Sequence, residues 1–183
     1  MPHEIHILNG SSIRPGSFIA FSRRLEEIFM IPVRLDRAEF DLRAAYDASR
    51  RQTNSTQLLG QILEGAPSPG KKRIGIVDVD LFIPILTFVF GEAQLGGTAA
   101  IVSTHRLSDQ FYGLARNDVR MLERLEKELV HELGHTFGLY HCQQFECVMR
   151  ASTYVEEIDL KKVYPCSNCS ALLNRQHQVL STE

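Results

Sequence analysis

The sequence predicts a single α/β domain with a mixed sheet of about five strands, flanking helices and a small metal-stapled C-terminal lobe. Three observations support this class. Strand and helix patterns alternate over residues 1–113, the longest helical pattern carries two histidines four residues apart, and all four cysteines lie beyond residue 140. We therefore divide the chain into a sheet lobe with the long helix, 1–138, and a small lobe, 139–183, within one compact domain.

The strand candidates are short apolar or alternating runs bounded by turn residues. In chain order they span residues 4–8, 33–36, 73–79, 86–93 and 99–103. Pro84 and the pair Gly96-Gly97 separate the last three runs. Strands that alternate with helices in this way favour a sheet covered by helices.

Four segments have helical patterns. The first spans 15–30, begins at Pro15 and has an apolar face formed by Ile19, Leu25, Ile28 and Phe29. The second follows a cap at Asn54 or Ser55, ends at Gly65 and is followed by a turn-rich segment, 65–72. The third starts at Asn117 or Asp118 and is expected to stop at Gly138, with leucines at three- and four-residue steps. A short last helix is predicted for 170–179.

Composition excludes some classes of function. The 183 residues carry 20 basic and 22 acidic side chains without a basic cluster, so nucleic acid is not an expected partner. The longest apolar run, 81–90, contains Pro84 and has about half of the roughly 20 residues that span a membrane, so no membrane partner is expected. Residues 1–10 lack a secretory signal pattern, which predicts a cytoplasmic protein with reduced cysteines.

The long helix contains the pattern His131-Glu132-Leu133-Gly134-His135. Histidines four residues apart project from one side of a helix and can bind one metal ion. A glycine at 138 can end the helix with positive φ and bring His141 back as the third ligand of a catalytic zinc. Glu132 would then take a proton from an activated water and later deliver one to the leaving amine.

Two other interpretations of this pattern remain open. The histidines could be surface residues of an amphipathic helix. Alternatively, a glutamate on a later helix, such as Glu156 or Glu157, could be the third ligand, although that class of zinc peptidase does not need Gly138 and His141.

The cysteines form two short-spaced pairs, Cys142 with Cys147 and Cys166 with Cys169. This arrangement is typical of a four-thiolate structural zinc site, so two zinc ions per chain are predicted, one catalytic and one structural. Two disulfides, or a redox pair at the last two cysteines alone, are the alternatives. Because Cys142 follows His141 directly, we expect the structural zinc to position the third catalytic ligand.

The five motif residues, His131, Glu132, His135, Gly138 and His141, match the extended metzincin signature. Together with the cysteines, Met149 and the stretches 78–82 and 88–93, they make the chain similar to the archaemetzincins over about residues 73–169. The resemblance implies a metzincin-like fold and a zinc-dependent metallopeptidase. It also implies that Met149 is the Met-turn methionine beneath the catalytic metal, whereas the residue alone would be read as core packing.

Substrate contacts are predicted less directly. The strand after Gly96-Gly97 resembles the metzincin edge strand that accepts an extended peptide, which would involve Thr98, Ala99, Ala100, Ile101 and Val102. A plain core strand would show the same pattern. Tyr154 is interpreted as a packing residue.

The expected function is hydrolysis of peptide bonds in a peptide or protein substrate, by a chain that we expect to be monomeric. The alternative is a zinc-stabilised peptide-binding or regulatory module with little turnover. Glu132 argues against that alternative, because a purely structural metal site has no use for a carboxylate at that position.

Overall fold

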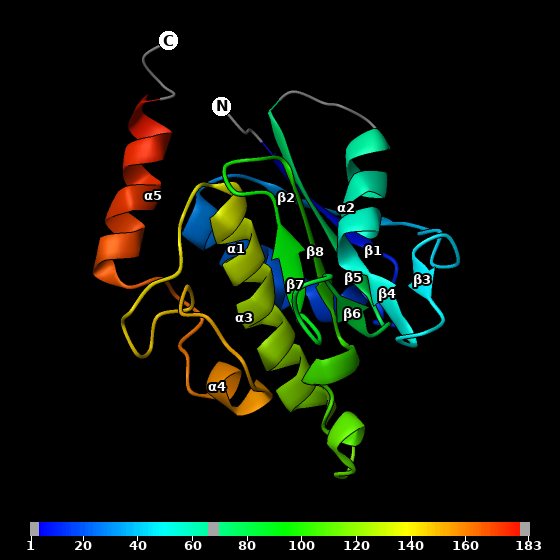
Figure 1. Ribbon diagram of the computed structural model, residues 1–183. Coiled ribbons are helices and arrows are strands. Elements are labelled where there is room, and N and C mark those ends of the chain that lie inside the picture. The colour runs from blue at the N-terminus through cyan, green and yellow to red at the C-terminus, as the bar shows by residue number, and fades with distance from the viewer. Residues whose placement is uncertain (1–3, 66–69, 180–183) are drawn as a thin grey trace.

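The computed structural model describes residues 4–65 and 70–179 and contains a central five-stranded sheet (Figure 1). The strand order is β2-β1-β5-β8-β7, with β7 antiparallel to β8 and the remaining pairs parallel. The predicted mixed sheet is thereby confirmed. Its strands are β1 (Glu4–Asn9), β2 (Val33–Arg37), β5 (Lys71–Val77), β7 (Gly91–Ala93) and β8 (Ala99–Ser103).

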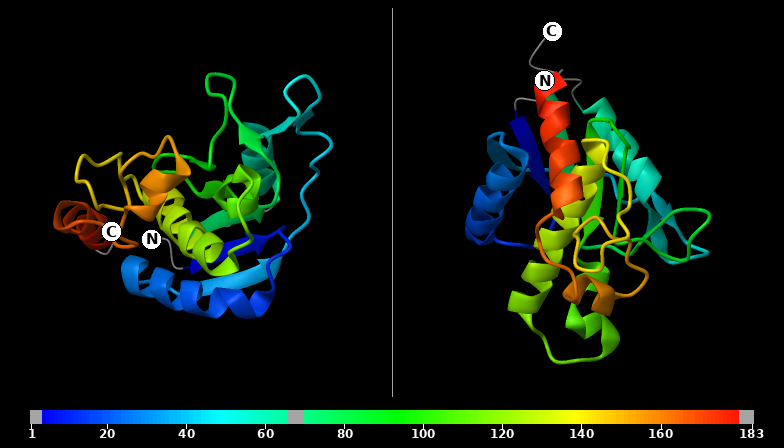
Figure 2. Two further views of the ribbon diagram at one scale, coloured as in Figure 1. Left: turned by 90° about the horizontal axis from the view of Figure 1, so that it is seen from below. Right: turned by 90° about the vertical axis from the view of Figure 1, so that its left-hand side faces the viewer.

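Helices cover both faces of this sheet. The core on one face includes side chains from α1 (Phe18–Phe29) and α3 (Asp118–Thr136), and the core on the other includes those of α2 (Ser55–Glu64). The buried strand β8 contributes side chains to both cores, because successive residues of a strand point to opposite faces of the sheet. Ala100 and Val102 belong to the first core, and Ala99 and Ile101 belong to the second. Figure 2 shows this layering from two further directions.

The helix ends follow the predicted signals. Asn54 Oδ1 accepts a hydrogen bond from the backbone N–H of Gln57 at 3.2 Å, and Asn117 Oδ1 caps α3 through Arg120 N–H at 3.0 Å. Gly138 has φ 82°, so it ends α3 in the left-handed conformation that glycine adopts without strain. The predicted inner face of α1 was wrong at Ile19, which is 61% exposed. Ile19 and Leu25 are six residues apart, about 240° around an α-helix, so they lie on different faces. A 3-10 turn (Pro15–Ser17) precedes α1, and the buried face of α1 consists of residues 18, 21, 25 and 29.

The predicted strand 86–93 is mostly a loop. Leu86 N–H bonds to Ile83 O in a turn, Ile85 is 86% exposed, and regular pairing begins only at Gly91. A small second sheet, order β3-β4-β6, was not predicted, because strands of two or three residues show no periodicity. Its strands are β3 (Tyr46–Asp47), β4 (Gln52–Asn54) and β6 (Leu81–Phe82), and the 3-10 helices His105–Leu107 and Asp109–Tyr112 follow β8.

Residues 139–179 follow α3, and α4 (Val155–Asp159) in this segment contacts α3. The helix α4 was not predicted, and α5 (Ser167–Val179) begins three residues earlier than predicted. Val148, Met149 and Ile158 belong to the same core as the α1 and α3 side chains. Of the predicted turn-rich segment 65–72, residues 66–69 lie outside the described residues. No helix within the described ranges is both long and apolar enough to cross a bilayer.

A buried lysine joins the sheet to the end of α3. Lys72 Nζ donates hydrogen bonds to Thr136 O at 2.7 Å and to Gly97 O at 2.6 Å. Burial lowers the pKa of Lys72 to about 8. The Lys72 ammonium group also interacts favourably with the negative C-terminal end of the α3 dipole. These interactions hold the last turn of α3, which carries His135, against the sheet.

Candidate metal centre

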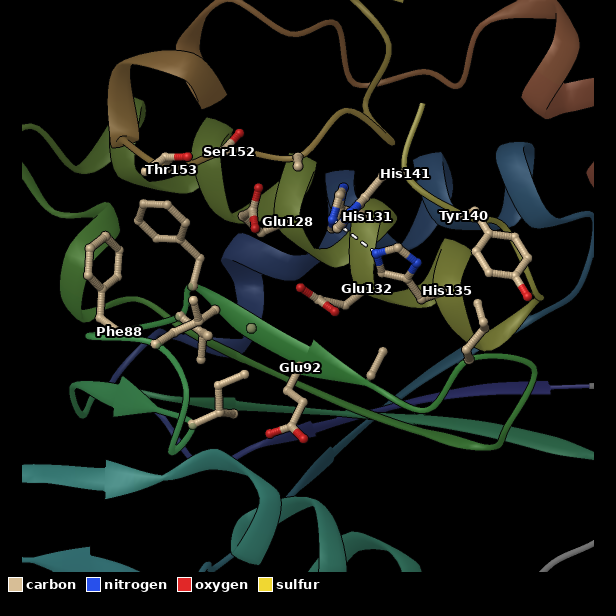
Figure 3. Close-up of a pocket in the computed structure, with 18 of the residues that line it drawn as sticks. Phe88, Glu92, Glu128, His131, Glu132, His135, Tyr140, His141, Ser152 and Thr153 are labelled. Atoms are coloured by element: carbon tan, nitrogen blue, oxygen red, sulfur yellow. Dashed lines mark hydrogen bonds between the residues drawn. The ribbon is translucent and has the colours of Figure 1, made fainter. Parts of the chain in front are cut away.

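Three histidine rings converge at the C-terminal end of α3. His131 and His135 lie one turn apart, and their Nε2 atoms are 3.2 Å from each other. The turn at Gly138 brings His141 back, and one ring nitrogen from each histidine lies within 4.8 Å of the others. Figure 3 shows His131, His135 and His141 around one point of the cleft. The four-residue spacing on the helix and the turn at Gly138 therefore bring the three histidine rings together, as predicted.

Backbone carbonyls orient the first two rings. His131 Nδ1 is 2.8 Å from Val148 O, and His135 Nδ1 is 2.7 Å from Leu139 O. Because a carbonyl oxygen only accepts, each Nδ1 carries the proton and each Nε2 has a free lone pair. Burial lowers the pKa of all three histidines, which favours the neutral form that binds a metal.

The nitrogen positions fit zinc. In a tetrahedral site with Zn–N bonds of about 2.0 to 2.1 Å, ligand nitrogens are about 3.3 Å apart. The separation of 3.2 Å between the Nε2 atoms of His131 and His135 agrees with this value. Three neutral histidines leave one coordination position open, which is typical of a catalytic zinc and not of a structural one.

Glu132 lies beside the histidines and is 6% exposed. The backbone of β7 passes close to its side chain: a Cβ atom at Gly91 would lie 2.7 Å from Glu132 Cγ and 2.8 Å from its Oε1. Burial, then the neighbouring carboxylates of Glu128 and Glu92, raise the pKa of Glu132 well above its usual value.

Met149 packs directly beneath the two helical histidines. It is fully buried, and a Cβ atom at Gly134, between those histidines, would overlap its Sδ atom and lie 2.9 Å from its Cε. A glycine at 134 is therefore required by close packing, and not by backbone conformation. This position is the one expected for a Met-turn methionine.

Replacing Gly134 with alanine should lower the free energy of unfolding by about 1–3 kcal/mol, because overpacking outweighs the higher helix propensity of alanine. Gly60→Ala in α2 is the matched control, since a Cβ atom there meets nothing within 4 Å. That variant should gain up to about 1 kcal/mol. Denaturant unfolding of the two zinc-loaded proteins measures the difference, and equal stabilisation of both would contradict the packing argument.

The four cysteines form a second cluster next to the first. Cys142 Sγ is 3.8 Å from Cys166 Sγ, and Cys147 Sγ is 3.8 Å from Cys169 Sγ. A tetrahedral zinc site with Zn–S bonds of about 2.3 Å has sulfur atoms about 3.8 Å apart, whereas a disulfide requires about 2.05 Å. The separations therefore favour one four-thiolate zinc site over two disulfides.

The surroundings favour a thiolate at Cys166, whereas burial raises the pKa of Cys147 and of Cys169, so a bound metal ion would have to deprotonate these two thiols. Backbone N–H groups of Cys166 and Gln144 donate to the sulfurs of Cys147 and Cys142 at 3.2 and 3.4 Å. Burial raises the pKa of the Cys166 thiol, but hydrogen bonds from Cys169, Cys142 and Cys147 outweigh it and lower that pKa to about 7. The backbone N–H of Cys142 also bonds to Met149 O at 2.9 Å, which links this cluster to the methionine that packs against Gly134.

The histidines and Glu132 line a cleft with a volume of about 530 Å³. The strand β7 and the loop that precedes it form one wall, and residues 151–153 contribute to the other. Sequence reasoning missed Glu92, Glu128 and Lys161, which also line this cleft. The spacing of Glu128 from His131 and Glu132 on the same helix could have revealed it, but nothing in the sequence singles out Lys161.

Two expectations about the cleft need correction. The strand that includes Ala99–Val102 is not an edge strand, because β8 pairs with β5 on one side and with β7 on the other. The free edge belongs to β7, so Thr98, Ala99, Ala100, Ile101 and Val102 form the core strand that was the alternative. The alternative third ligands also fail, because neither lines the cleft: Glu156 is exposed, and Glu157 Oε2 accepts hydrogen bonds from Thr153 and Tyr154 N–H and caps α4. Tyr154 is 66% exposed and does not line the cleft.

Comparisons with known proteins agree with the family resemblance that the sequence motifs indicate. The family model described as Peptidase family M54 matches residues 32–175. An archaemetzincin from Thermococcus kodakarensis is 41% identical over 138 residues, 75% of this chain and 74% of that protein. Over 131 residues, the archaemetzincin of Methanopyrus kandleri is 42% identical, covering 72% of this chain and 71% of that protein.

Two solved structures have the same fold. A zinc-dependent peptidase from Methanocorpusculum labreanum superposes with a TM-score of 0.84 at 30% identity, over 93% of this chain and 100% of that one. The crystal structure of archaemetzincin from Methanopyrus kandleri superposes with a TM-score of 0.83 at 33% identity, over 96% and 95% of the two chains.

Proposed function

The chain belongs to peptidase family M54, the archaemetzincins, and is a zinc metallopeptidase; from this we propose that His131, His135 and His141 hold its catalytic zinc and that Glu132 is the general base. The observation that carries the proposal is the convergence of three histidine nitrogens beside a buried carboxylate in one cleft. The substrate is a peptide or protein.

Zinc at this position would lower the pKa of a water molecule to about 7 and polarise the carbonyl group of the bond to be cleaved. Glu132 supplies the proton transfers. Its carboxylate would accept a proton from the attacking water and later deliver a proton to the leaving amine. The close contact with the Gly91 backbone restricts where the carboxylate can move.

The free edge of β7 is the proposed binding surface for the substrate backbone. The strand runs alongside α3, since Gly91 lies against Glu132 and the backbone N–H of Gly96 bonds to His135 O at 2.9 Å. An extended peptide that adds to this edge would pass over the three histidines. We propose β7, in place of β8, as the strand that pairs with substrate.

The cysteine cluster is the proposed site of the second zinc. Four thiolates close the coordination sphere, so this ion would stabilise the structure and take no part in chemistry. Thiols that remain available for zinc are typical of a reducing compartment, and we propose a cytoplasmic location on that ground.

Native mass spectrometry should find two zinc ions per chain, and denaturing conditions should remove both. The zinc-loaded protein should hydrolyse members of a mixed peptide library, and a strong chelator should abolish this activity. One zinc per chain would contradict the two-site assignment. Peptide binding without cleavage would instead support a zinc-stabilised peptide-binding module.

A further inference from the structure

One end of the cleft contains polar side chains that the proposed chemistry does not use. We call Glu128, Ser152 and Lys161 the polar end. In Figure 3, Glu128 and Ser152 lie to one side of His131, while Tyr140 lies on the opposite side of the histidines. The polar end is therefore positioned to contact a side chain of a substrate bound across the metal centre.

The polar end has unused hydrogen-bonding capacity. The side chains of Glu128 and Lys161 are 4% and 1% exposed, and their charged atoms are 3.9 Å apart, which is longer than a hydrogen bond. Glu128 Oε1 and Ser152 Oγ are buried without a hydrogen-bond partner among the described residues. Buried polar groups without partners are costly, so these atoms favour a ligand that satisfies them.

The charges restrict which ligand fits. An acidic side chain would meet the carboxylate of Glu128, and a basic one would meet the ammonium group of Lys161. An apolar side chain would leave both groups without a hydrogen bond. A carboxamide carries no net charge and can donate to Glu128 Oε1 while its oxygen accepts from Lys161 Nζ or Ser152 Oγ.

The direction of β7 indicates which substrate residue reaches the polar end. Glu128 lies one turn before Glu132 on α3, so it is near the start of β7, whereas Gly96 beyond the strand lies near His135. A peptide that pairs antiparallel with β7, as β8 does on the other side, runs from the Tyr140 end toward the polar end. Residues after the cleaved bond would therefore face Glu128 and Lys161, and the first of them would be the nearest, because Glu128 is only one helical turn from Glu132.

We propose that the polar end selects a glutamine or asparagine side chain at the position directly after the cleaved bond. This inference rests on the proposed function, because it assumes that peptides bind across the histidines. The polar end would determine substrate specificity separately from the metal ligands and from Glu132.

Binding is the first test, because it does not require turnover. Peptides that differ only at this position, with Gln, Glu, Lys or Leu, are titrated against zinc-loaded Glu132→Gln protein by calorimetry. The Gln peptide should bind at least about tenfold more tightly than the other three, since a site built for hydrogen bonds rejects groups that cannot make them. Equal affinities, or tightest binding of the Glu, Lys or Leu peptide, would overturn the proposal.

Two variants should change the preference in opposite directions. Glu128→Gln leaves the ammonium group of Lys161 without its carboxylate and should shift preference to the Glu peptide. Lys161→Met leaves Glu128 unpaired and should shift preference to the Lys peptide. Glu123→Gln and Lys162→Met, at exposed positions on the same elements or beside them, should keep the wild-type order. Destabilisation alone would weaken all four peptides together, so shifts that are not opposite would count against the proposal.

Cleavage of the same peptides by the wild-type protein separates this inference from the proposed function. Preferential binding of the Gln peptide together with its preferential cleavage would support both. Preferential binding without cleavage would support the polar end as a recognition site and contradict the peptidase assignment of the metal centre. Cleavage without preference would support the metal centre and contradict the polar end.

Discussion

Replacing Glu132 with glutamine should lower kcat/KM for peptide hydrolysis by about 10³-fold or more while both zinc ions remain bound. Glutamine keeps the size of the side chain and can still form hydrogen bonds, but it cannot accept the proton of the attacking water. The loss falls on kcat, because the histidine ligands and the free edge of β7 are unchanged. Peptide cleavage measured alongside zinc content tests this expectation.

Glu123→Gln is the matched control for this substitution. Glu123 is exposed on the same helix, nine residues before Glu132, and it does not line the cleft. Its activity should equal that of the wild type. If Glu132→Gln retained more than about a tenth of the wild-type activity with full zinc content, another group would have to be the base.

Replacing Cys166 with serine should remove the structural zinc and weaken zinc binding at the histidine site by about 10- to 100-fold. Two hydrogen bonds and one direct chain connection link the two sites. Cys142 is bonded through its backbone N–H to Met149 O, Val148 O orients the ring of His131, and His141 directly precedes Cys142. Loss of groups that orient metal ligands typically reduces metal affinity by this factor.

Zinc content at a series of chelator concentrations measures both affinities. Asn168→Ser, at an exposed position two residues further along in the first turn of α5, is the control and should retain two zinc ions with wild-type affinities. Retention of full affinity and activity at the histidine site after loss of the structural zinc would show that the two sites are independent. In that case the cysteine cluster would only stabilise the fold of the C-terminal lobe.

Local sequence spacing predicted most of the metal centre. His131 and His135 share one face because four residues make about one helical turn, and Gly138 permits the reversal that returns His141. Local sequence patterns also explain why β1, β2, β5 and α3 were predicted correctly, because these elements are long enough to show periodicity. The strands of two or three residues and the 83–90 loop were missed because their pairing depends on distant partners.

The cleft could not be predicted in the same way. Thr98–Val102 has the pattern of an edge strand and of a core strand alike, and only the pairing of β8 with both β5 and β7 decides between them. Lys161 lies far from Glu128 in the chain, and no spacing rule joins them. Their approach to 3.9 Å results from the packing of α4 and the following turn against α3.

Sequence spacing alone therefore predicted the candidate metal ligands: three histidines and a neighbouring glutamate in one helix and its C-terminal turn, and four cysteines in two short-spaced pairs. Helix geometry and the coordination preferences of zinc act over a few residues, so spacing was sufficient. The strand with a free edge and the buried charges that border the cleft could be identified only from the folded structure. Those features arise where distant segments meet, and the burial that gives Glu128, Lys161 and Glu132 their properties exists only in the folded chain.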